Sequence, residues 1–280
     1  MYTDSDLGLD LDATVYALDS TTIDLCLSLF PWASFRRAKG AVKLHTMIDI
    51  QGAIPVFIDI THGKVHDASA LDHIVFQPGS YLVMDRGYID FDRLYQIHEA
   101  MTYFVVRSKG NLQFRRRLSR PVEKASGVRS DQTIVLTGPK TSMLYPAPLR
   151  RVSYYSEEID KRFVFLTNDF NLPPLTVAGI YRNRWQIELF FKWIKQHLRI
   201  KRFFGTSQNC VKTQVWIAVA VYVLIAIIKK QLGLGHSLYT ILQILSTTLF
   251  EKTPVPLVFQ RYDEESRIIN PSKQLMLFDI

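Results

Sequence analysis

Apolar and β-branched positions divide the first hundred residues into short strands and helices. Alternating or continuous apolar runs predict strands at Thr14–Leu29, Lys43–Ile50, Ile54–Thr61, Tyr81–Met84 and Thr102–Arg107. The first three strands are consecutive, which favours an antiparallel meander with Gln51-Gly52 as a hairpin turn. The later strands alternate with predicted helices, which favours parallel additions to the sheet. The chain therefore begins with a mixed α/β sheet.

Two helices are predicted between these strands. Asp67 is expected to cap a short helix over Ala68–Phe76, and Asp90 is expected to cap Phe91–Ala100. The two histidines next to Asp67, His62 and His66, are interpreted as partners in local hydrogen bonds rather than as metal ligands.

Residues 109–172 differ in pattern and predict a β-rich insertion. Its strand-like runs are Thr133–Leu136, Arg151–Tyr155 and Arg162–Thr167. Its first part is strongly basic, with Glu123 opposing a run of cations: Lys109, Arg115, Arg116, Arg117, Arg120, Lys124 and Arg129. Such a run is usually a solvated face, and it supports a polyanion partner only together with catalytic evidence.

One helix is predicted from Ile180 to Lys195, because apolar residues recur there at helical spacing without Gly or Pro. Thr176 is its expected cap. On a helical wheel, four polar side chains share an arc of roughly 60° beside the apolar face: Tyr181, Arg184, Glu188 and Lys195. Helices near 208–231 and 236–250 and a tail of low order follow.

The pattern implies six segments in chain order. They are a lead-in (1–13), the first part of an α/β core (14–108), the β-rich insertion (109–172), the second part of the core (173–205), C-terminal helices (206–250) and the tail (251–280).

Composition narrows the class of protein. The 280 residues are 48% hydrophobic and 21% charged, which is typical of a globular protein, and the net charge of +8 raises the prior for a polyanionic partner. Cys26 and Cys210 lack metal-site spacing and indicate free thiols in a reducing cytosol. The longest apolar run, Val215–Ile228, is shorter than a membrane span and favours a buried helix.

Three acidic residues on separate elements are the candidate chemistry. Asp19 lies within the first strand, Asp85 ends the strand Tyr81–Met84, and Glu188 lies on the long helix. Oxygen ligands of this kind suit two Mg²⁺ ions in phosphoryl transfer. Each also has a plainer interpretation, since Asp before Gly favours turns and Glu188 can form an ordinary helix pair with Arg184.

The cations beside these acids extend the hypothesis. Arg184 and Lys195 can neutralise phosphates, and Tyr181 can hydrogen-bond a phosphate or stack on a displaced base. Arg86 can bind phosphate or pair with its neighbour Asp85.

These motifs resemble those of the DDE transposases of bacterial insertion sequences, in the branch with a Y-x2-R-x3-E-x6-K motif. Tyr181, Arg184, Glu188 and Lys195 match that spacing, while Asp19 in Leu18-Asp19-Ser20-Thr21 and Asp85 in Met84-Asp85-Arg86-Gly87-Tyr88 match the first two acids. The resemblance implies an RNase H-like fold interrupted by the β-rich insertion.

The resemblance also implies an activity. Asp19, Asp85 and Glu188 would bind two Mg²⁺ ions, with Mn²⁺ as a substitute, for cleavage and strand transfer at element ends. Tyr181, Arg184, Lys195 and Arg86 would contact DNA. The partners would be element-end and target DNA, with a homodimer on paired ends in the cytoplasm, associated with the nucleoid, and no membrane.

One departure from the family pattern limits this expectation. Members usually carry an N-terminal helical domain that recognises element ends, whereas 18 residues precede Asp19. The sequence therefore predicts a truncated copy or part of a split gene. The alternatives are a DNA-binding remnant and an RNase H-like nuclease without strand transfer.

Overall fold

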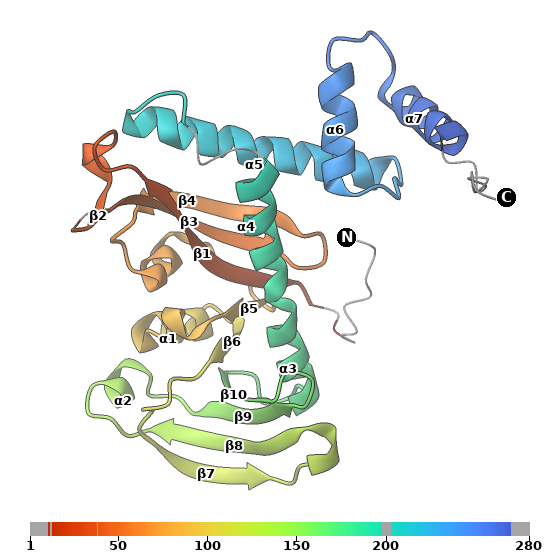
Figure 1. Cartoon of the computed structure of the whole chain (residues 1–280). Helices are drawn as coiled ribbons and strands as arrows, with labels where there is room; N and C mark the ends of the chain where they lie inside the picture. Colours follow the sequence, from red (N-terminus) through yellow and green to blue (C-terminus); the bar gives the residue numbers. More distant parts are fainter. Residues whose placement is uncertain (1–10, 12, 38, 198–202, 270–280) are drawn as a thin grey trace, which may run out of the picture. The chain divides into compact units, whose positions relative to one another are not determined.

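The computed structural model of the chain describes residue 11 and residues 13–37, 39–197 and 203–269 (Figure 1). Internal contacts divide the described residues into two units, one up to residue 218 and one from residue 219. Each unit is described by itself, and α5 contributes to both.

A mixed sheet organises the larger unit. Its strands follow the order β2-β3-β1-β5-β6-β10-β9-β8-β7, with β4 also paired to β3. The first strands are β1 (Val15–Leu25), β2 (Ser34–Arg36), β3 (Lys39–Asp49), β4 (Ile54–His62), β5 (Tyr81–Met84) and β6 (Tyr103–Arg107). The β1-β3-β4 pairs are antiparallel and the β1-β5-β6 pairs are parallel. The predicted mixed α/β sheet with flanking helices is confirmed.

The β-rich segment continues the same sheet, because β10 pairs antiparallel with β6. Its strands are β7 (Phe114–Arg120), β8 (Val128–Leu136), β9 (Leu149–Ser156) and β10 (Lys161–Thr167). The basic run that sequence alone left without structure forms part of β7. The single-turn helices of this unit are η1 (Pro31–Ala33), η3 (Arg86–Tyr88), η4 (Lys124–Ser126) and α2 (Thr141–Leu144).

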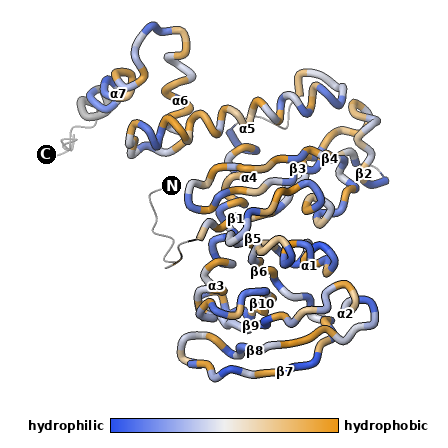
Figure 2. The backbone as a smooth tube through the Cα atoms, turned by 180° about the vertical axis from the view of Figure 1, so that it is seen from behind, coloured by the Kyte–Doolittle hydropathy of each residue, from blue (hydrophilic) through white to orange (hydrophobic). Residues whose placement is uncertain are grey.

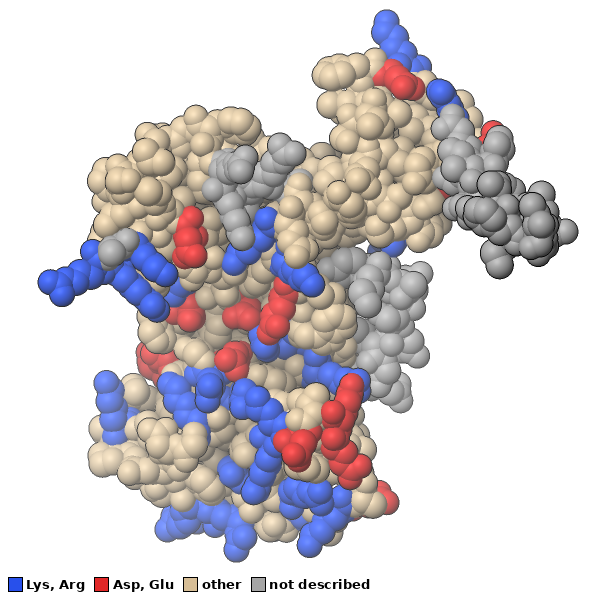
Figure 3. Space-filling model, viewed as in Figure 1, with Lys and Arg blue, Asp and Glu red and all other residues tan. Residues whose placement is uncertain are grey.

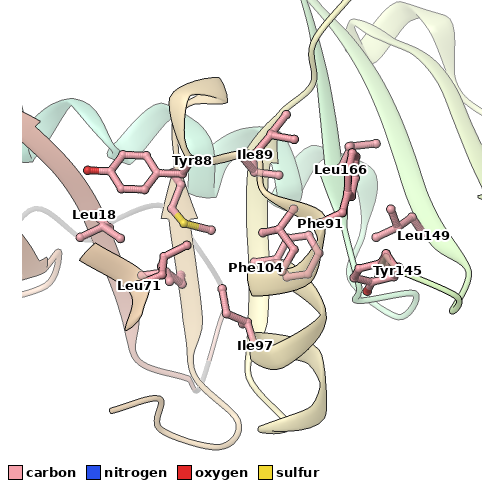
Figure 4. Close-up of a cluster of buried hydrophobic side chains, with 14 of the residues drawn as sticks. Leu18, Leu71, Tyr88, Ile89, Phe91, Ile97, Phe104, Tyr145, Leu149 and Leu166 are labelled. Carbon is pink, nitrogen blue, oxygen red and sulfur yellow. The ribbon is translucent and has the colours of Figure 1, made fainter. Parts of the chain in front are cut away.

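Helices cover both faces of the sheet. Leu18, Met84, Val106 and Leu166 share one face with α1 (Phe91–Glu99) in a large apolar cluster, part of which appears in Figure 4. Because side chains alternate along a strand, Asp19 faces the other way. That second face carries α3 (Pro174–Asn183) and α4 (Trp185–His197).

Two predicted caps illustrate the limits of local signals. Asp90 caps α1 by accepting from the Arg93 N–H, as expected. Asp67 was expected to cap the earlier helix, Ala68–Phe76, but His66 is the cap, and Asp67 begins the 3-10 helix η2 (Asp67–His73). The Asp67 carboxylate instead accepts from Ser20 of β1 and from Lys43 of β3.

The single helix predicted over Ile180–Lys195 is wrong, since the chain forms α3 and α4 with a break at Arg184. The Arg184 N–H bonds to the Tyr181 carbonyl and the Ile187 N–H bonds to that of Arg184, both at i−3, so the turn is tighter than α-helical. The Asn183 amide also donates to the Gly179 carbonyl. Thr176 is not the cap, because α3 begins at Pro174 after Pro173.

The second unit holds the end of α5 (Gln208–Gln231), with α6 (Leu238–Thr248) and α7 (Val255–Ile269). The low order predicted for 251–280 is wrong for Val255–Ile269, and the remaining residues lie outside the described range. Within the described residues, α5 alone is long and apolar enough to cross a membrane, a test that core helices also pass (Figure 2). About a third of the most apolar stretch of α5 is buried, which is less than the sequence led us to expect.

Candidate active site

Asp19 lies in the interior of β1, where it is paired across the antiparallel ladder with Thr46 of β3. The backbone N–H of Ser20 donates to one carboxylate oxygen at 2.8 Å, and Arg184 donates to the other at 2.6 Å. Burial raises the pKa of Asp19 to about 6, against the lowering effects of Arg184 and the Ser20 N–H. Glu188 and Asp85 raise this pKa further, so both acids lie within electrostatic range of Asp19.

Asp85 lies next to Asp19 because of strand register. In the parallel β1–β5 ladder Leu18 pairs with Met84, and the two aspartates are the residues that follow. Neighbouring strands run about 4.8 Å apart. The Tyr181 hydroxyl donates to Asp85 at 3.0 Å, and burial followed by the charge of Asp85 raises the pKa of Tyr181 to about 12. Tyr181 therefore stays protonated and acts as a donor at neutral pH.

Glu188 approaches the two aspartates from the first turn of α4. Its side chain is 57% exposed, and it accepts from Arg184 at 2.5 Å. The same guanidinium, 15% exposed, thus contacts both Asp19 and Glu188. Although burial lowers the pKa of Arg184, the charges of Asp19, Tyr181 and Glu188 outweigh that effect and raise it. Arg184 is a permanent cation between two of the three acids.

The remaining predicted DNA contacts have different surroundings. Lys195 donates to the Thr21 hydroxyl at 2.6 Å and to the Thr22 carbonyl at 2.9 Å, so it lies against β1. Arg86 begins η3 directly after Asp85, is exposed, and forms no ion pair with any residue that the structure describes. The structure thus brings Tyr181, Arg184 and Lys195 to the two central strands. Figure 3 shows acidic side chains gathered mid-view, with Lys and Arg around them.

The donor set suits a hard divalent cation, because it consists of carboxylates from β1, the end of β5 and α4. Within the described part of the chain, no three acidic, histidine or cysteine side chains are already arranged as a metal site. The positive charge between Asp19 and Glu188 belongs to Arg184. A metal held by all three acids would require this guanidinium to shift.

A cavity of about 650 Å³ borders the site. Tyr181, Arg184 and Trp185 line one side, and Tyr154 and Phe163 line another. The Tyr181 ring also packs on Phe165, with centroids 4.7 Å apart. The cavity is therefore aromatic and opens beside the residues that contact Asp19 and Asp85.

Sequence reasoning did not predict where two groups of polar residues lie in the fold. One is Asp67, which accepts from the Ser20 hydroxyl on the sheet face opposite Asp19. The other is a set of arginines on β7, β9 and β10, namely Arg116, Arg151 and Arg162, which strand register places on one sheet face. Neither group has a local signal, since both depend on how distant strands pair.

Comparison with known proteins identifies the family. The "Transposase DDE domain" family matches residues 10–224. The chain is 32% identical over 264 residues to a Sinorhizobium fredii protein named as transposase y4zB, covering 93% of this chain and 72% of that protein. It is 30% identical over 210 residues to a Geobacillus stearothermophilus protein named as the transposase for element IS5377, covering 74% and 55% respectively.

A Synechocystis protein named as the transposase for element IS4SA is 25% identical over 258 residues, covering 85% of this chain and 67% of that protein. The fold resembles a piggyBac transposase from a synaptic complex with hairpin DNA, with a TM-score of 0.53 and 13% identity. That likeness covers 95% of this chain and 59% of the other, and it supports the RNase H-like fold. The chain spans between about half and three quarters of these relatives, and it belongs to the DDE transposases of insertion elements.

Proposed function

We propose that this chain cuts and joins DNA at the ends of an insertion element, with Asp19, Asp85 and Glu188 as its catalytic acids. The observation that carries the proposal is the convergence of β1, β5 and α4. Asp19 and Asp85 each directly follow one member of the Leu18–Met84 pair on adjacent parallel strands. Arg184 connects Asp19 to Glu188.

Two Mg²⁺ ions bound by these acids would activate the attacking oxygen and stabilise the leaving one. The side chains of the chain itself would hold the DNA strand. Arg184, released from the acids, and Arg86, already exposed, would bind phosphates, because guanidinium groups pair with phosphate oxygens in a bidentate way. Tyr181 would orient Asp85, and Lys195 would hold β1 beside Asp19 while contacting phosphate.

The sheet face that carries Arg116, Arg151 and Arg162, here called the basic sheet face, is the second part of the proposed DNA interface. Arg151 donates to Gln132 and Arg162 donates to Ser153, so neither guanidinium is matched by a carboxylate among the described residues. Burial first, and then the charge of Arg162, lower the pKa of Arg151. Two close guanidinium groups without an acid favour a polyanion, and DNA phosphates are the one that the proposed activity supplies.

Several finer features complete the proposal. The core would comprise residues 14–108 and 173–205, with 109–172 inserted, the C-terminal helices at 206–250 and the tail at 251–280. The chain would act as a homodimer on paired element ends and on target DNA, in the cytoplasm at the nucleoid. Mn²⁺ would substitute for Mg²⁺.

The direct test uses duplexes that carry the ends of the encoding element. Purified chain should nick these duplexes and join them to target DNA with Mg²⁺ or Mn²⁺, and should be inactive with EDTA. Glu188→Gln should abolish both steps with unchanged thermal unfolding. Glu99→Gln is the matched control, because Glu99 is exposed at the end of α1, which packs on the sheet face opposite Asp19.

Three outcomes would contradict the proposal in different ways. Activity in EDTA, or undiminished activity of Glu188→Gln, would exclude this metal site. Cleavage without joined product would indicate a nuclease. Salt-dependent DNA binding without cleavage in any of several metals would indicate a DNA-binding remnant.

A further inference from the structure

Asp67 lies behind the proposed metal site, on the other face of the sheet. Its Oδ1 accepts from the Ser20 hydroxyl at 2.6 Å and from the Lys43 ammonium at 2.9 Å. Lys43 is 13% exposed and also donates to the Val65 carbonyl at 2.7 Å. The Asp67 side chain is 33% exposed, and its carboxylate is held by residues of two strands, β1 and β3.

Ser20 connects this carboxylate to Asp19. Its hydroxyl donates to Asp67, and its backbone N–H donates to Asp19 at 2.8 Å. Because the two groups belong to one residue, fixing the hydroxyl on one face of β1 also fixes the N–H that orients Asp19. A mobile Ser20 would leave the Asp19 carboxylate freer to rotate.

Asp67 also lies beside the segment that carries the second acid. A Cβ added to Gly87 would lie 3.6 Å from the Asp67 Oδ2. The hydroxyl of Tyr88 is fully buried near Ser20, and its pKa is raised by burial and by the charges of Asp19 and Asp67. Asp67 therefore lies close to the two segments that carry the acid pair, β1 and the turn Asp85–Tyr88.

We propose that Asp67 is a positioning residue for the metal site, which orients Asp19 through Ser20 and neutralises the Lys43 ammonium behind it. This inference rests on the proposed metal-dependent function. Removal of a residue that orients a metal ligand typically lowers metal affinity 10- to 100-fold. Asp67 acts through one intervening residue, so about tenfold is expected.

Asp67 is ionised at neutral pH, which the second part of the inference requires. Burial alone would raise its pKa, but the hydrogen bonds from Ser20 and Lys43 outweigh burial and lower the pKa. Asp67→Asn keeps the size of the side chain while removing the charge and weakening the bond to Lys43. It therefore tests positioning and charge without opening a cavity.

The experiment measures Mn²⁺ binding to the full chain without DNA, by titration calorimetry and by the electron paramagnetic resonance signal of free Mn²⁺. Asp67→Asn should weaken Mn²⁺ binding about tenfold. Asp72→Asn is the matched control, because Asp72 lies on the same 3-10 helix and pairs with Arg93 away from the site. That variant should bind Mn²⁺ within twofold of the unaltered chain.

A second variant keeps the inference testable if Asp67→Asn fails to fold. Ser20→Ala removes the connecting hydroxyl and leaves the Asp67–Lys43 pair intact, so it should also weaken Mn²⁺ binding. The double variant should lose less than the product of the two single effects, because both changes break one connection. In cleavage assays, a higher Mn²⁺ requirement with recovery at saturating Mn²⁺ should accompany this loss.

The outcomes separate this inference from the proposed function. If the unaltered chain binds Mn²⁺ through Glu188 while Asp67→Asn binds equally well, the positioning role is overturned and the proposed function stands. If Mn²⁺ binding is absent or unaffected by Glu188→Gln, the metal site itself is overturned. A fall in melting temperature with unchanged Mn²⁺ affinity would assign Asp67 a purely structural role.

Discussion

Arg184 donates to Asp19 at 2.6 Å, although 165 positions separate the two residues in the chain. The contact joins the break between α3 and α4 to the centre of the sheet. The same guanidinium reaches Glu188, so one cation balances two acids that would otherwise repel each other. Arg184 thus places a positive charge between Asp19 and Glu188, as a bound divalent ion would.

Replacing Arg184 should therefore destabilise the metal-free chain and make its stability depend on metal. Arg184→Ala leaves two acids unpaired, and removal of one partner from a largely buried ion pair costs about 3 kcal/mol. Mn²⁺ should raise the melting temperature of this variant by more than that of the unaltered chain, because the ion replaces the lost charge. Differential scanning calorimetry with and without Mn²⁺ measures both effects.

Arg182→Ala is the control for this comparison. Arg182 lies two positions earlier and pairs with Glu158, but both side chains are more than 70% exposed, and exposed pairs contribute little. Its melting temperature and its response to Mn²⁺ should match those of the unaltered chain. Equal Mn²⁺ responses in all three proteins would contradict the idea that Arg184 occupies the place of a metal charge.

The raised pKa of Asp19 predicts how stability changes with pH. Because the pKa is about 6 in the folded chain and about 3.9 when unfolded, the folded state binds the proton more tightly. The Asp19 contribution is thus full below pH 4 and is lost as pH rises through 6, amounting to about 3 kcal/mol. The free energy of unfolding, measured with urea and without divalent ions, should fall between pH 4 and 7. The fall should exceed that of Asp19→Asn by about 3 kcal/mol.

The comparison with Asp19→Asn removes the contributions of other groups, since both proteins share them. Parallel pH profiles would show that Asp19 titrates in its ordinary range. The experiment must be free of divalent ions, because a bound cation favours the ionised carboxylate and lowers its pKa.

Tyr181→Phe should separate the hydroxyl of Tyr181 from its ring. The variant loses the bond to Asp85 but keeps the packing on Phe165, so stability should fall by about 1 kcal/mol. Cleavage should fall about tenfold if Asp85 depends on this bond for its orientation. Initial cleavage rates at saturating Mn²⁺, with circular dichroism melting, distinguish the two effects, and an unchanged rate would limit Tyr181 to packing.

The sequence predicted the sheet type and five strands of the core, though not β2, because these follow from local patterns. The strand Tyr81–Met84 matches β5, and the alternation of elements predicted which pairs are parallel. It also predicted Asp85 at a strand end, where α/β sheets place functional residues. These features depend on the periodicity of apolar residues and on turn chemistry.

The helix break at Arg184 could not be predicted in that way. The segment has helical periodicity throughout, and the tight turn accompanies tertiary contacts of Arg184 with Asp19. The role of Asp67 was hidden for a similar reason, since an Asp before a helix is a common cap, while its partners Ser20 and Lys43 come from other strands. In both cases the side chain forms an ion pair with a residue distant in the chain, and no local sequence pattern indicates that partner.

The basic sheet face yields the last prediction, because Arg151 and Arg162 lie on the face opposite Asp19. Arg151→Gln and Arg162→Gln should each weaken DNA binding and lower the slope of log affinity against log salt by about one phosphate contact. Cleavage at saturating DNA should be unchanged, since neither side chain contacts the acids. Binding titrations at several salt concentrations measure the slope, and Lys140→Gln, an exposed cation in the turn after β8, is the control. Slopes unchanged by both arginine variants would mean that DNA does not cross this face, and a loss of cleavage at saturating DNA would mean that the face acts on the chemical step.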